Sequence, residues 1–232
     1  MRRSLSLAKP WLQRYMASVD FIFYFPYVFA SFFTIVNPIQ ATLTFITLTP
    51  VASTEERKRI SLRTTSVAFA IALLFAVGGN LILQFFGITV DSLRVAGGVL
   101  LFLVAIDMLK GEKEHKKVTE AELQDANLRE DISVFPLAMP LLTGPGAITT
   151  VIVQMGTALT IFQKALVMTA LVLTFATTYL ILRSSEYIDK ALGVTGIMVL
   201  TRIQGLVLGA IAVNFVAMGA WNIFVSLKGT SP

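Results

Sequence analysis

The sequence contains no cysteine, a single histidine and few charged residues. The lack of cysteine excludes disulfide bonds, thiolate metal sites and a cysteine nucleophile. The one histidine, His115, lies among Lys113, Lys116 and Lys117, which is typical of a solvated loop. We also find no Ser/His/Asp set, paired carboxylates or phosphate-binding glycine loop. We therefore predict no catalytic residues, no metal site and no cofactor, and the chain is not expected to be an enzyme or an ATP-driven pump.

Charged residues make up 14% of the 232-residue chain, and hydrophobic residues make up 55%. A soluble domain carries about 25% charged residues, and the mean hydropathy here is +0.75. These values predict an all-α protein whose main partner is the lipid bilayer. The formal net charge of +5 comes mainly from loops and tails, which reflects membrane topology, so no nucleic-acid partner is expected.

Six segments are long and apolar enough to cross a membrane, because a spanning helix needs about 20 mainly apolar residues. Before them, residues 1–19 lack the apolar run of a cleavable signal peptide and are predicted to be an N-terminal tail. Residues 110–131 form a charged loop between two three-helix units, 20–109 and 132–227, within one membrane domain. The predicted spans are residues 21–49, 64–84, 92–109, 132–155, 164–182 and 197–226.

The basic residues of the connecting loops predict the orientation. The first, third and fifth connections carry more Lys and Arg than the second and fourth connections and the two termini together. Because cytoplasmic loops are enriched in Lys and Arg, both termini are predicted to lie outside the cytoplasm.

Two of the apolar segments are interrupted by helix-breaking residues. The first contains Asn37-Pro38-Ile39 and the fourth contains Gly144-Pro145-Gly146. Lipid cannot satisfy the backbone groups that a broken helix exposes, so such breaks survive only where protein or a polar cavity covers them. Interruptions at corresponding places in two halves of a chain indicate a transporter binding site near the bilayer midplane.

The spacing of these features suggests an internal duplication. The interval from Pro38 to Pro145 is slightly less than half the chain, and the interval from Arg94 to Arg202 is longer by only one position. Each unit would hold three spans, and an odd number of spans inserts the second unit upside down relative to the first. The sequence thus predicts six transmembrane helices in an inverted three-plus-three repeat, a plan that many secondary transporters share.

The repeat-related arginines and the glycines that follow them are predicted to act in structure or gating. Arg94 and Arg202 lie near the starts of their spans, where they either cap carbonyls of the broken helices or reach the interface. Gly97, Gly98 and Gly205 are expected to let helices pack closely.

The two breaks predict the substrate-binding residues. Proline suits the first turn of a helix, and the free N–H groups there attract a carboxylate. Asn37 would act as an N-cap or as a ligand group. Nearby hydroxyl and amide side chains, including Thr150 and Gln154, add neutral hydrogen-bonding groups. The candidate site residues are Asn37, Pro38, Ile39, Gln40, Ala41 and Thr42 at the first break, and Thr143, Gly144, Pro145, Gly146, Ala147 and Thr149 at the second.

Five short motifs along the chain form a recognisable set. They are Asn37-Pro38-Ile39, Phe86-Gly87-Ile88, Leu93-Arg94-Val95-Ala96-Gly97-Gly98, Pro136-Leu137-Ala138-Met139-Pro140 and Gly144-Pro145-Gly146-Ala147-Ile148-Thr149. These motifs resemble the MarC family, also called the neutral amino-acid transporter family, and the resemblance covers nearly the whole chain from about residue 30. It implies six spans in an inverted repeat, an inner or plasma membrane location, and transport of small neutral amino acids such as glycine and alanine.

One position departs from the family pattern. Members commonly continue Asn-Pro-Ile with glycine and a nearby second proline, whereas here Gln40 follows and the next proline is Pro50. A bulky amide at this place would narrow or re-specify the site.

Three functions remain open from the residues. A secondary transporter would bind a small zwitterion at the breaks and couple its movement to H⁺ or Na⁺. A passive channel for a small solute would need polar residues along several spans, and spans two and five offer few. A non-transporting regulatory membrane protein would use the breaks only for packing.

Overall fold

The computed structural model describes residues 10–50, 52–110 and 133–229, which form helices and contain no strand. Residues 111–131 of the predicted charged loop and the first nine residues of the predicted tail lie outside the described residues, and Lys110, the first residue of the predicted loop, ends α4. α1 begins within the stretch that the sequence assigned to the tail. The helices are α1 (Pro10–Val36), α2 (Pro38–Leu48), α3 (Thr54–Phe85), α4 (Val90–Lys110), the π-helix η3 (Ser133–Leu142), α6 (Pro145–Thr157), α7 (Ile161–Arg183) and α8 (Ser185–Gly229).

Five segments of the described chain are long and apolar enough to cross a membrane. They correspond to five of the six predicted spans. The remaining predicted span, 132–155, is divided between η3 and α6, and neither piece reaches a spanning length alone. The five segments are Phe23–Leu48, Thr54–Phe85, Val90–Lys110, Ile161–Arg183 and Thr195–Lys228.

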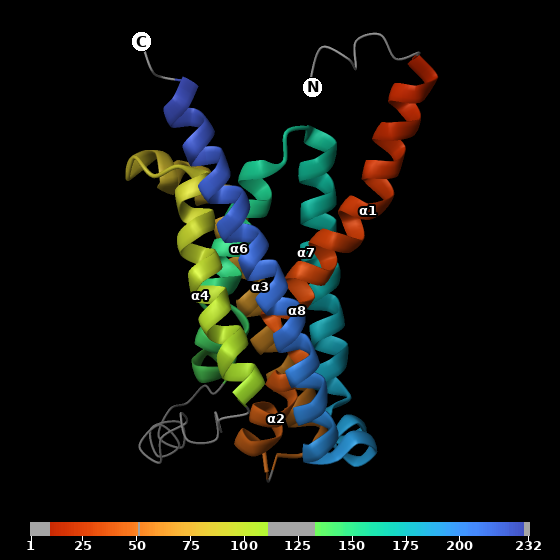
Figure 1. The fold of residues 1–232 in the computed structure, drawn as a ribbon. Coiled ribbons are helices and arrows are strands. Elements are labelled where there is room, and N and C mark those ends of the chain that lie inside the picture. Colours follow the sequence, from red (N-terminus) through yellow and green to blue (C-terminus); the bar gives the residue numbers. More distant parts are fainter. Residues whose placement is uncertain (1–9, 51, 111–132, 230–232) are drawn as a thin grey trace.

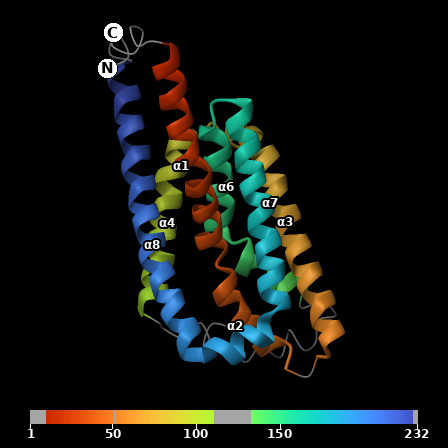
Figure 2. The ribbon, with the colours of Figure 1, turned by 90° about the vertical axis from the view of Figure 1, so that its right-hand side faces the viewer.

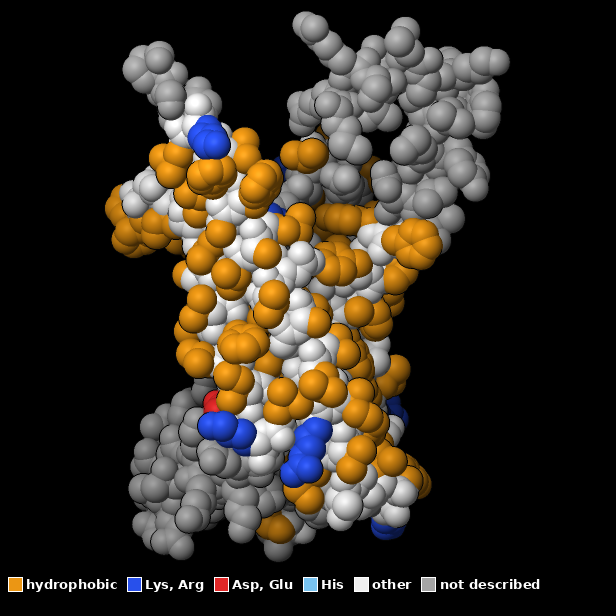
Figure 3. Space-filling view, viewed as in Figure 1, with side chains coloured by type: hydrophobic (Ala, Val, Ile, Leu, Met, Phe, Trp, Pro, Cys, Tyr) orange, Lys and Arg blue, Asp and Glu red, His pale blue; other side chains and the backbone are white. Residues whose placement is uncertain are grey.

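The long helices run side by side, and the start of α1 and the end of α8 lie at the same end of the bundle (Figure 1). The surface agrees with a lipid environment, because hydrophobic side chains cover the middle of the face shown in Figure 3 and basic ones gather near its ends. Large apolar side chains are exposed on several helices, among them Leu74 on α3, Leu103 on α4 and Leu206 on α8.

Local sequence signals set the starts of two long helices. Ser53 caps α3, and its hydroxyl and the side chain of Glu56 form reciprocal bonds with each other's backbone amides. Thr160 and Gln163 form the same capping box at the start of α7. Each box satisfies two amides that a helix start would otherwise leave without acceptors.

The part of the chain that precedes the last span differs from a simple continuous helix. Gly193 adopts φ 59° and ψ 178°, which interrupts α8 after its first two turns. A positive φ of this size is easy for glycine and costly for other residues. The short stretch before Gly193 therefore crosses the end of the bundle, and the rest of α8 turns upward along α4 (Figure 2).

Two groups of buried apolar side chains form the core. One lies among α1, α2, α3, η3, α6 and α7, and the other joins α4 to α8 with one residue of α6. Small residues let α4 and α8 approach closely. A Cβ atom on Gly98 would lie 2.9 Å from the Ala212 carbonyl oxygen, and one on Gly219 would lie 2.8 Å from the Asp91 carbonyl oxygen. Such close backbone contact gives the van der Waals packing that holds membrane helices together.

We expect Gly98→Ala to destabilise the protein by about 1–3 kcal/mol, because the added methyl group would meet backbone atoms of α8 that cannot yield locally. Gly78→Ala is the matched control, since no atom lies within 4 Å of the position of its Cβ. Because alanine has a higher helix propensity than glycine, the melting temperature of the control should equal or exceed that of the wild-type protein. Thermal unfolding in detergent measures both. Equal melting temperatures for the two variants would contradict close packing of α4 on α8.

Candidate functional site

At the first break, Asn37 connects α1 to α2 through a left-handed backbone conformation with φ 49° and ψ 60°. Asparagine tolerates this region better than most residues. Its amide donates to the Phe33 carbonyl at 3.0 Å, which ends α1, and its own carbonyl accepts from the Ala41 amide at 3.1 Å. Its side-chain oxygen accepts from the Gln40 amide at 3.3 Å, so Asn37 is an N-cap, which is one of the two roles that the sequence analysis offered. Pro38 occupies the first turn, where its missing N–H costs nothing.

Gln40, the residue that departs from the family pattern, is part of this cap. Its side-chain oxygen accepts a hydrogen bond from the Asn37 side-chain amide. Ile39 is the only residue in the first turn of α2 whose N–H finds no acceptor among the described residues. The start of α2 therefore offers an approaching carboxylate one amide.

At the second break the chain passes from a π-helix to an α-helix, which the sequence analysis did not anticipate. Pro136 and Pro140 lack N–H groups, so a regular α-helical ladder could not be complete over η3. The wider turns end where the Thr143 amide donates to the Ala138 carbonyl five residues back, at 3.0 Å. The Thr143 hydroxyl donates to the Ala68 carbonyl of α3 at 3.2 Å and fixes the end of η3.

The start of α6 is less satisfied than the start of α2. Gly144 is its N-cap and has no side chain to accept a hydrogen bond. Ile148 has the first α6 amide with an acceptor in the described chain, the Gly144 carbonyl at 3.1 Å. Pro145 has no N–H, so Gly146 and Ala147 present two free amides at a helix N-terminus, and Ala147 is buried. Two convergent amides with the positive end of a helix dipole suit a carboxylate.

The structure brings both breaks against the same helix, α4. The Asn37 side-chain nitrogen lies 3.9 Å from the Met108 sulfur. A Cβ atom on Gly146 would lie 2.8 Å from a Leu101 methyl carbon and 3.9 Å from a methyl carbon of Ile35, two residues before Asn37. Because α4 rises about 1.5 Å per residue, the two contact points on α4 are about 10 Å apart along its axis.

Most threonines near the breaks satisfy their own helices. The Thr42 hydroxyl donates to the Pro38 carbonyl at 3.0 Å, and the Thr150 hydroxyl donates to the Gly146 carbonyl at 2.8 Å. Thr149 differs, because its buried side chain places a methyl group where a Cβ on Gly97 would lie, at 1.9 Å. Of the candidate threonines, it is the one whose hydroxyl has no partner among the described residues.

The two arginines do not occupy equivalent places, although the sequence aligned them. Arg94 is buried, pairs with Asp91 at 3.4 Å, and lies 6.0 Å from the centre of the Phe215 ring. Arg202 is exposed on the outer face of α8. Gly205 packs inward, where an added Cβ would lie 2.9 Å from the Met108 Cβ. The alignment that pairs Arg94 with Arg202 is therefore shifted by one residue relative to the alignment that matches the buried faces of α4 and α8.

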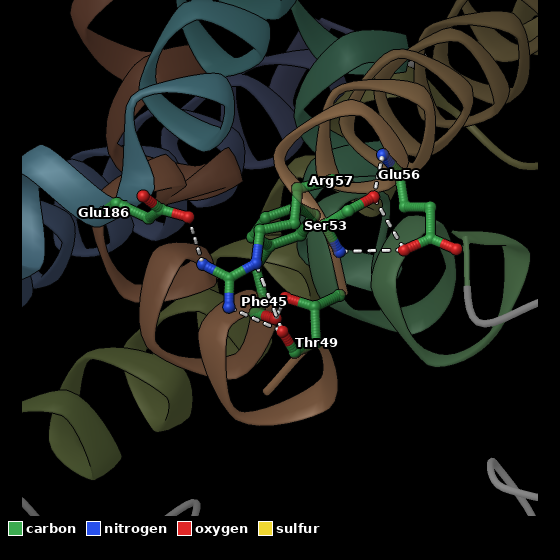
Figure 4. Close-up of polar contacts among 6 residues, drawn as sticks. All are labelled: Phe45, Thr49, Ser53, Glu56, Arg57 and Glu186. Carbon is green, nitrogen blue, oxygen red and sulfur yellow. Dashed lines mark hydrogen bonds and ion pairs between the residues drawn. The ribbon is translucent and has the colours of Figure 1, made fainter. Parts of the chain in front are cut away.

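Below the breaks, Arg57 joins three elements at one end of the bundle (Figure 4). Its guanidinium donates to the Thr49 carbonyl at the end of α2, at 3.2 and 2.6 Å, and to the Glu186 carboxylate in the first turn of α8, at 2.8 Å. The sequence analysis treated Arg57 only as a topology signal. Its role as a C-terminal cap for α2 depends on a contact that no local pattern predicts.

Comparison with known proteins identifies the family. The model of the MarC family integral membrane proteins matches residues 21–224. The chain belongs to the MarC family. This confirms the resemblance that the sequence motifs indicated, and no solved structure matches the chain significantly.

Relatives in the MarC family come from archaea and bacteria. UPF0056 membrane protein MJ1677 of Methanocaldococcus jannaschii is 43% identical over 84% of this chain and 95% of its own length. YvbG of Bacillus subtilis is 35% identical over 85% of this chain and 94% of its own length. YhcE of Escherichia coli is 35% identical over 90% of this chain and 96% of its own length. All three names describe membrane proteins. The family description and the five long apolar segments of the described chain are consistent with an integral membrane protein that crosses the bilayer several times.

We expect Asn37→Ala to destabilise the protein more than Asn37→Gly does. Loss of the side-chain cap costs about 1 kcal/mol when alanine replaces asparagine and only about a few tenths of a kcal/mol when glycine does. Alanine in addition pays about 1–2 kcal/mol for the left-handed conformation, whereas glycine adopts it freely. Thermal unfolding in detergent would measure the difference. If glycine and alanine destabilised equally, the left-handed turn at Asn37 would not be the constraint that shapes the break.

We expect Arg57→Met to destabilise the protein by about 1.5–3 kcal/mol, because the Thr49 carbonyl would lose its charged donor. Glu186→Gln is the matched control. It weakens only the half-exposed ion pair, which is worth about 0–1 kcal/mol. Chemical or thermal unfolding of both variants compares them. Equal effects would mean that the ion pair, and not the cap on α2, holds this end of the bundle.

Proposed function

We propose that this MarC family protein is a secondary transporter of small neutral amino acids such as glycine and alanine. The observation that carries the proposal is the start of α6, where two free amides at a helix N-terminus lie within an apolar helical bundle, beside α4 and α1. An amide pair of this kind would hold a substrate carboxylate near the bilayer midplane. Asn37, Thr149 and the backbone carbonyls at the breaks would hold the ammonium group.

An inverted three-plus-three repeat of six spans is part of the proposal, and the packing supports it. Exchange of the two halves maps α1 onto η3, α2 onto α6, α3 onto α7 and α4 onto α8. The contacts between helices repeat in the same way. In the first half α3 packs on η3 and α6, and in the second half its counterpart α7 packs on α1 and α2, the counterparts of η3 and α6. Similarly, α4 packs on α6 as α8 packs on α2. The capping boxes at Ser53 and Thr160 are separated by the same interval as Pro38 and Pro145.

The buried faces repeat with nearly the same spacing. Phe69 and Phe175 occupy nearly corresponding places in α3 and α7, and their ring centres lie 5.8 Å apart, as expected for a pair beside a two-fold axis. Matching buried residues of α4 and α8 are separated in the sequence by the same interval as Pro38 and Pro145. Matching buried residues of α3 and α7 are separated by an interval that is one position shorter. The pairs are Gly98/Gly205, Leu101/Leu208, Ala105/Ala212 and Met108/Phe215 on α4 and α8, and Ser61/Val167, Thr64/Ala170, Thr65/Leu171, Ala68/Thr174, Ala72/Thr178 and Ala76/Leu182 on α3 and α7.

We place the protein in the cell inner, or plasma, membrane with both termini outside the cytoplasm. An even number of spans puts both termini on one side, and the positive-inside rule gives the side. Coupling to H⁺ or Na⁺ would drive net movement. The channel alternative gains little from the second and fifth spans, since the hydroxyls of Thr65, Thr169, Thr174 and Thr178 bond to their own helices.

Uptake by proteoliposomes containing the purified protein tests the proposal. We expect saturable uptake of radiolabelled glycine. Unlabelled alanine should inhibit this uptake competitively, and unlabelled lysine should not inhibit it. Gly146→Ala should weaken apparent affinity about tenfold or more, because the new methyl group would crowd the free amides and weaken bonds to a carboxylate. The fold should tolerate this change, since the nearest obstacle is the flexible end of Leu101.

Gly209→Ala is the matched control, because its Cβ would make an ordinary contact with Ala105 at 3.6 Å. Non-saturable flux through wild-type protein would indicate a channel instead. Absence of any flux under H⁺ and Na⁺ gradients in either direction would favour a non-transporting role.

A further inference from the structure

The second long helix of each half ends in a different way. In the second half, α7 ends at Arg183, and Ser184 departs from helical angles with φ −93° and ψ 14°. The chain then crosses the end of the bundle as a short arm, residues 185–192, before it turns at Gly193 (Figure 2). In the first half, α3 continues without interruption to Phe85. One half of the chain is therefore bent at this place, and the other is straight.

Two glycines with positive φ mark the far ends of these stretches. Gly87 has φ 66° after α3, and Gly193 has φ 59° after the short arm. The interval between them in the sequence equals the interval between matching buried residues of α3 and α7. At that interval the short arm corresponds to residues 79–86 at the end of α3, and the bend at Ser184 corresponds to Gly78.

Gly78 has no packing role in the straight helix. Glycine is less favourable than alanine inside a helix, yet a Cβ atom on Gly78 would meet nothing within 4 Å. Gly79 differs, because its Cβ would lie 2.7 Å from the Ile152 side chain, so close packing accounts for it. Sharp bends in helices occur at pairs of glycine and serine residues. Gly78-Gly79 and Ser184-Ser185 are such pairs at corresponding positions.

An ion pair holds the short arm in place. The Arg57 guanidinium on α3 binds the Glu186 carboxylate in the arm at 2.8 Å and also donates to the Thr49 carbonyl (Figure 4). At the interval that relates α3 to α7, Glu186 corresponds to Asn80. The Asn80 side chain is exposed and makes no hydrogen bond within the described residues. The bent stretch is therefore held by an ion pair, whereas its straight counterpart has no equivalent one in the described chain.

We propose that Gly78 is a hinge at which α3 bends as the chain bends at Ser184. Residues 79–86 then fold across their end of the bundle while the short arm straightens at the opposite end. In an inverted repeat, this exchange of conformations gives a site between the halves access to one side of the membrane at a time. The proposal rests on the repeat and the transport function proposed above, but the motion itself can be measured without transport.

Distances between spin labels measure the motion, and the chain has no native cysteine that would take up label. Labels on Phe85→Cys and Ile161→Cys, both exposed positions, report the end of α3 relative to the start of α7. In the full chain in lipid nanodiscs we expect two distances that differ by about 5–10 Å, because seven residues of helix, about 10 Å long, swing about Gly78. Added glycine should change their ratio. Leu62→Cys with Ile161→Cys is the matched control and should give one distance, since Leu62 precedes the hinge.

Gly78→Ala separates the hinge from the fold. Its melting temperature should equal or exceed that of the wild-type protein, because the new methyl group meets no atom. Alanine favours the straight helix, so the population of bent α3 and the rate of glycine uptake should both fall about fivefold, which corresponds to about 1 kcal/mol of helix propensity. Equilibrium glycine binding should change less than about twofold. Gly209→Ala is the matched control and should leave the label distances and the uptake rate unchanged.

The outcomes separate this hinge from the transport function. Two label distances whose ratio responds to Gly78→Ala, without any glycine uptake, would support the hinge and contradict transport. Saturable uptake at the wild-type rate in Gly78→Ala would overturn the hinge and leave transport intact. A single label distance in every preparation would overturn the hinge whatever the uptake. A Gly78→Ala variant that melted below the wild-type protein would mean that Gly78 serves packing, and would overturn the hinge as well.

Discussion

The hydrogen-bonding requirement of the backbone in lipid governs this structure. Wherever a helix stops inside an apolar bundle, its terminal N–H and C=O groups need partners from protein. At the first break, Asn37 supplies them itself: its amide ends α1, its carbonyl starts α2, and its side chain caps the new helix. At the second break, Gly144 supplies no side chain, so the amides of Gly146 and Ala147 are left over. The same requirement thus gives a nearly closed first break, where the described chain leaves only the Ile39 amide without an acceptor, and an open second break.

The position of the open break depends on how closely the helices pack. Gly97 lets Thr149 of α6 lie against α4, and Gly146 lets the start of α6 meet Leu101. Gly98 and Gly219 bring α8 against the opposite face of α4 by backbone contact. Because the contacts of Gly98 and Gly219 involve backbone atoms, α4 and α8 have little freedom to move relative to each other without separating whole helices. The contacts that position the free amides against α4 are made by the side chains of Thr149 and Leu101, which can adjust more easily.

The sequence predicted the helical class, five of the spans with their approximate limits, both breaks and the N-cap at Asn37. These features depend on local properties: apolar length, the missing N–H of proline, and the tolerance of asparagine for a left-handed turn. The π-helix η3, the cap that Arg57 places on α2, and the burial of Arg94 beside Phe215 depend on contacts between distant segments.

Arg94 and Arg202 lie at similar positions in the two halves of the sequence but in different environments in the structure. The interval between Arg94 and Arg202 is one position longer than the interval at which the buried faces of α4 and α8 repeat. One residue of helix is a rotation of about 100 degrees, since a turn takes about 3.6 residues. That rotation is enough to put one guanidinium inside the bundle and the other on its surface. Similar backbones in the two halves therefore carry different chemistry.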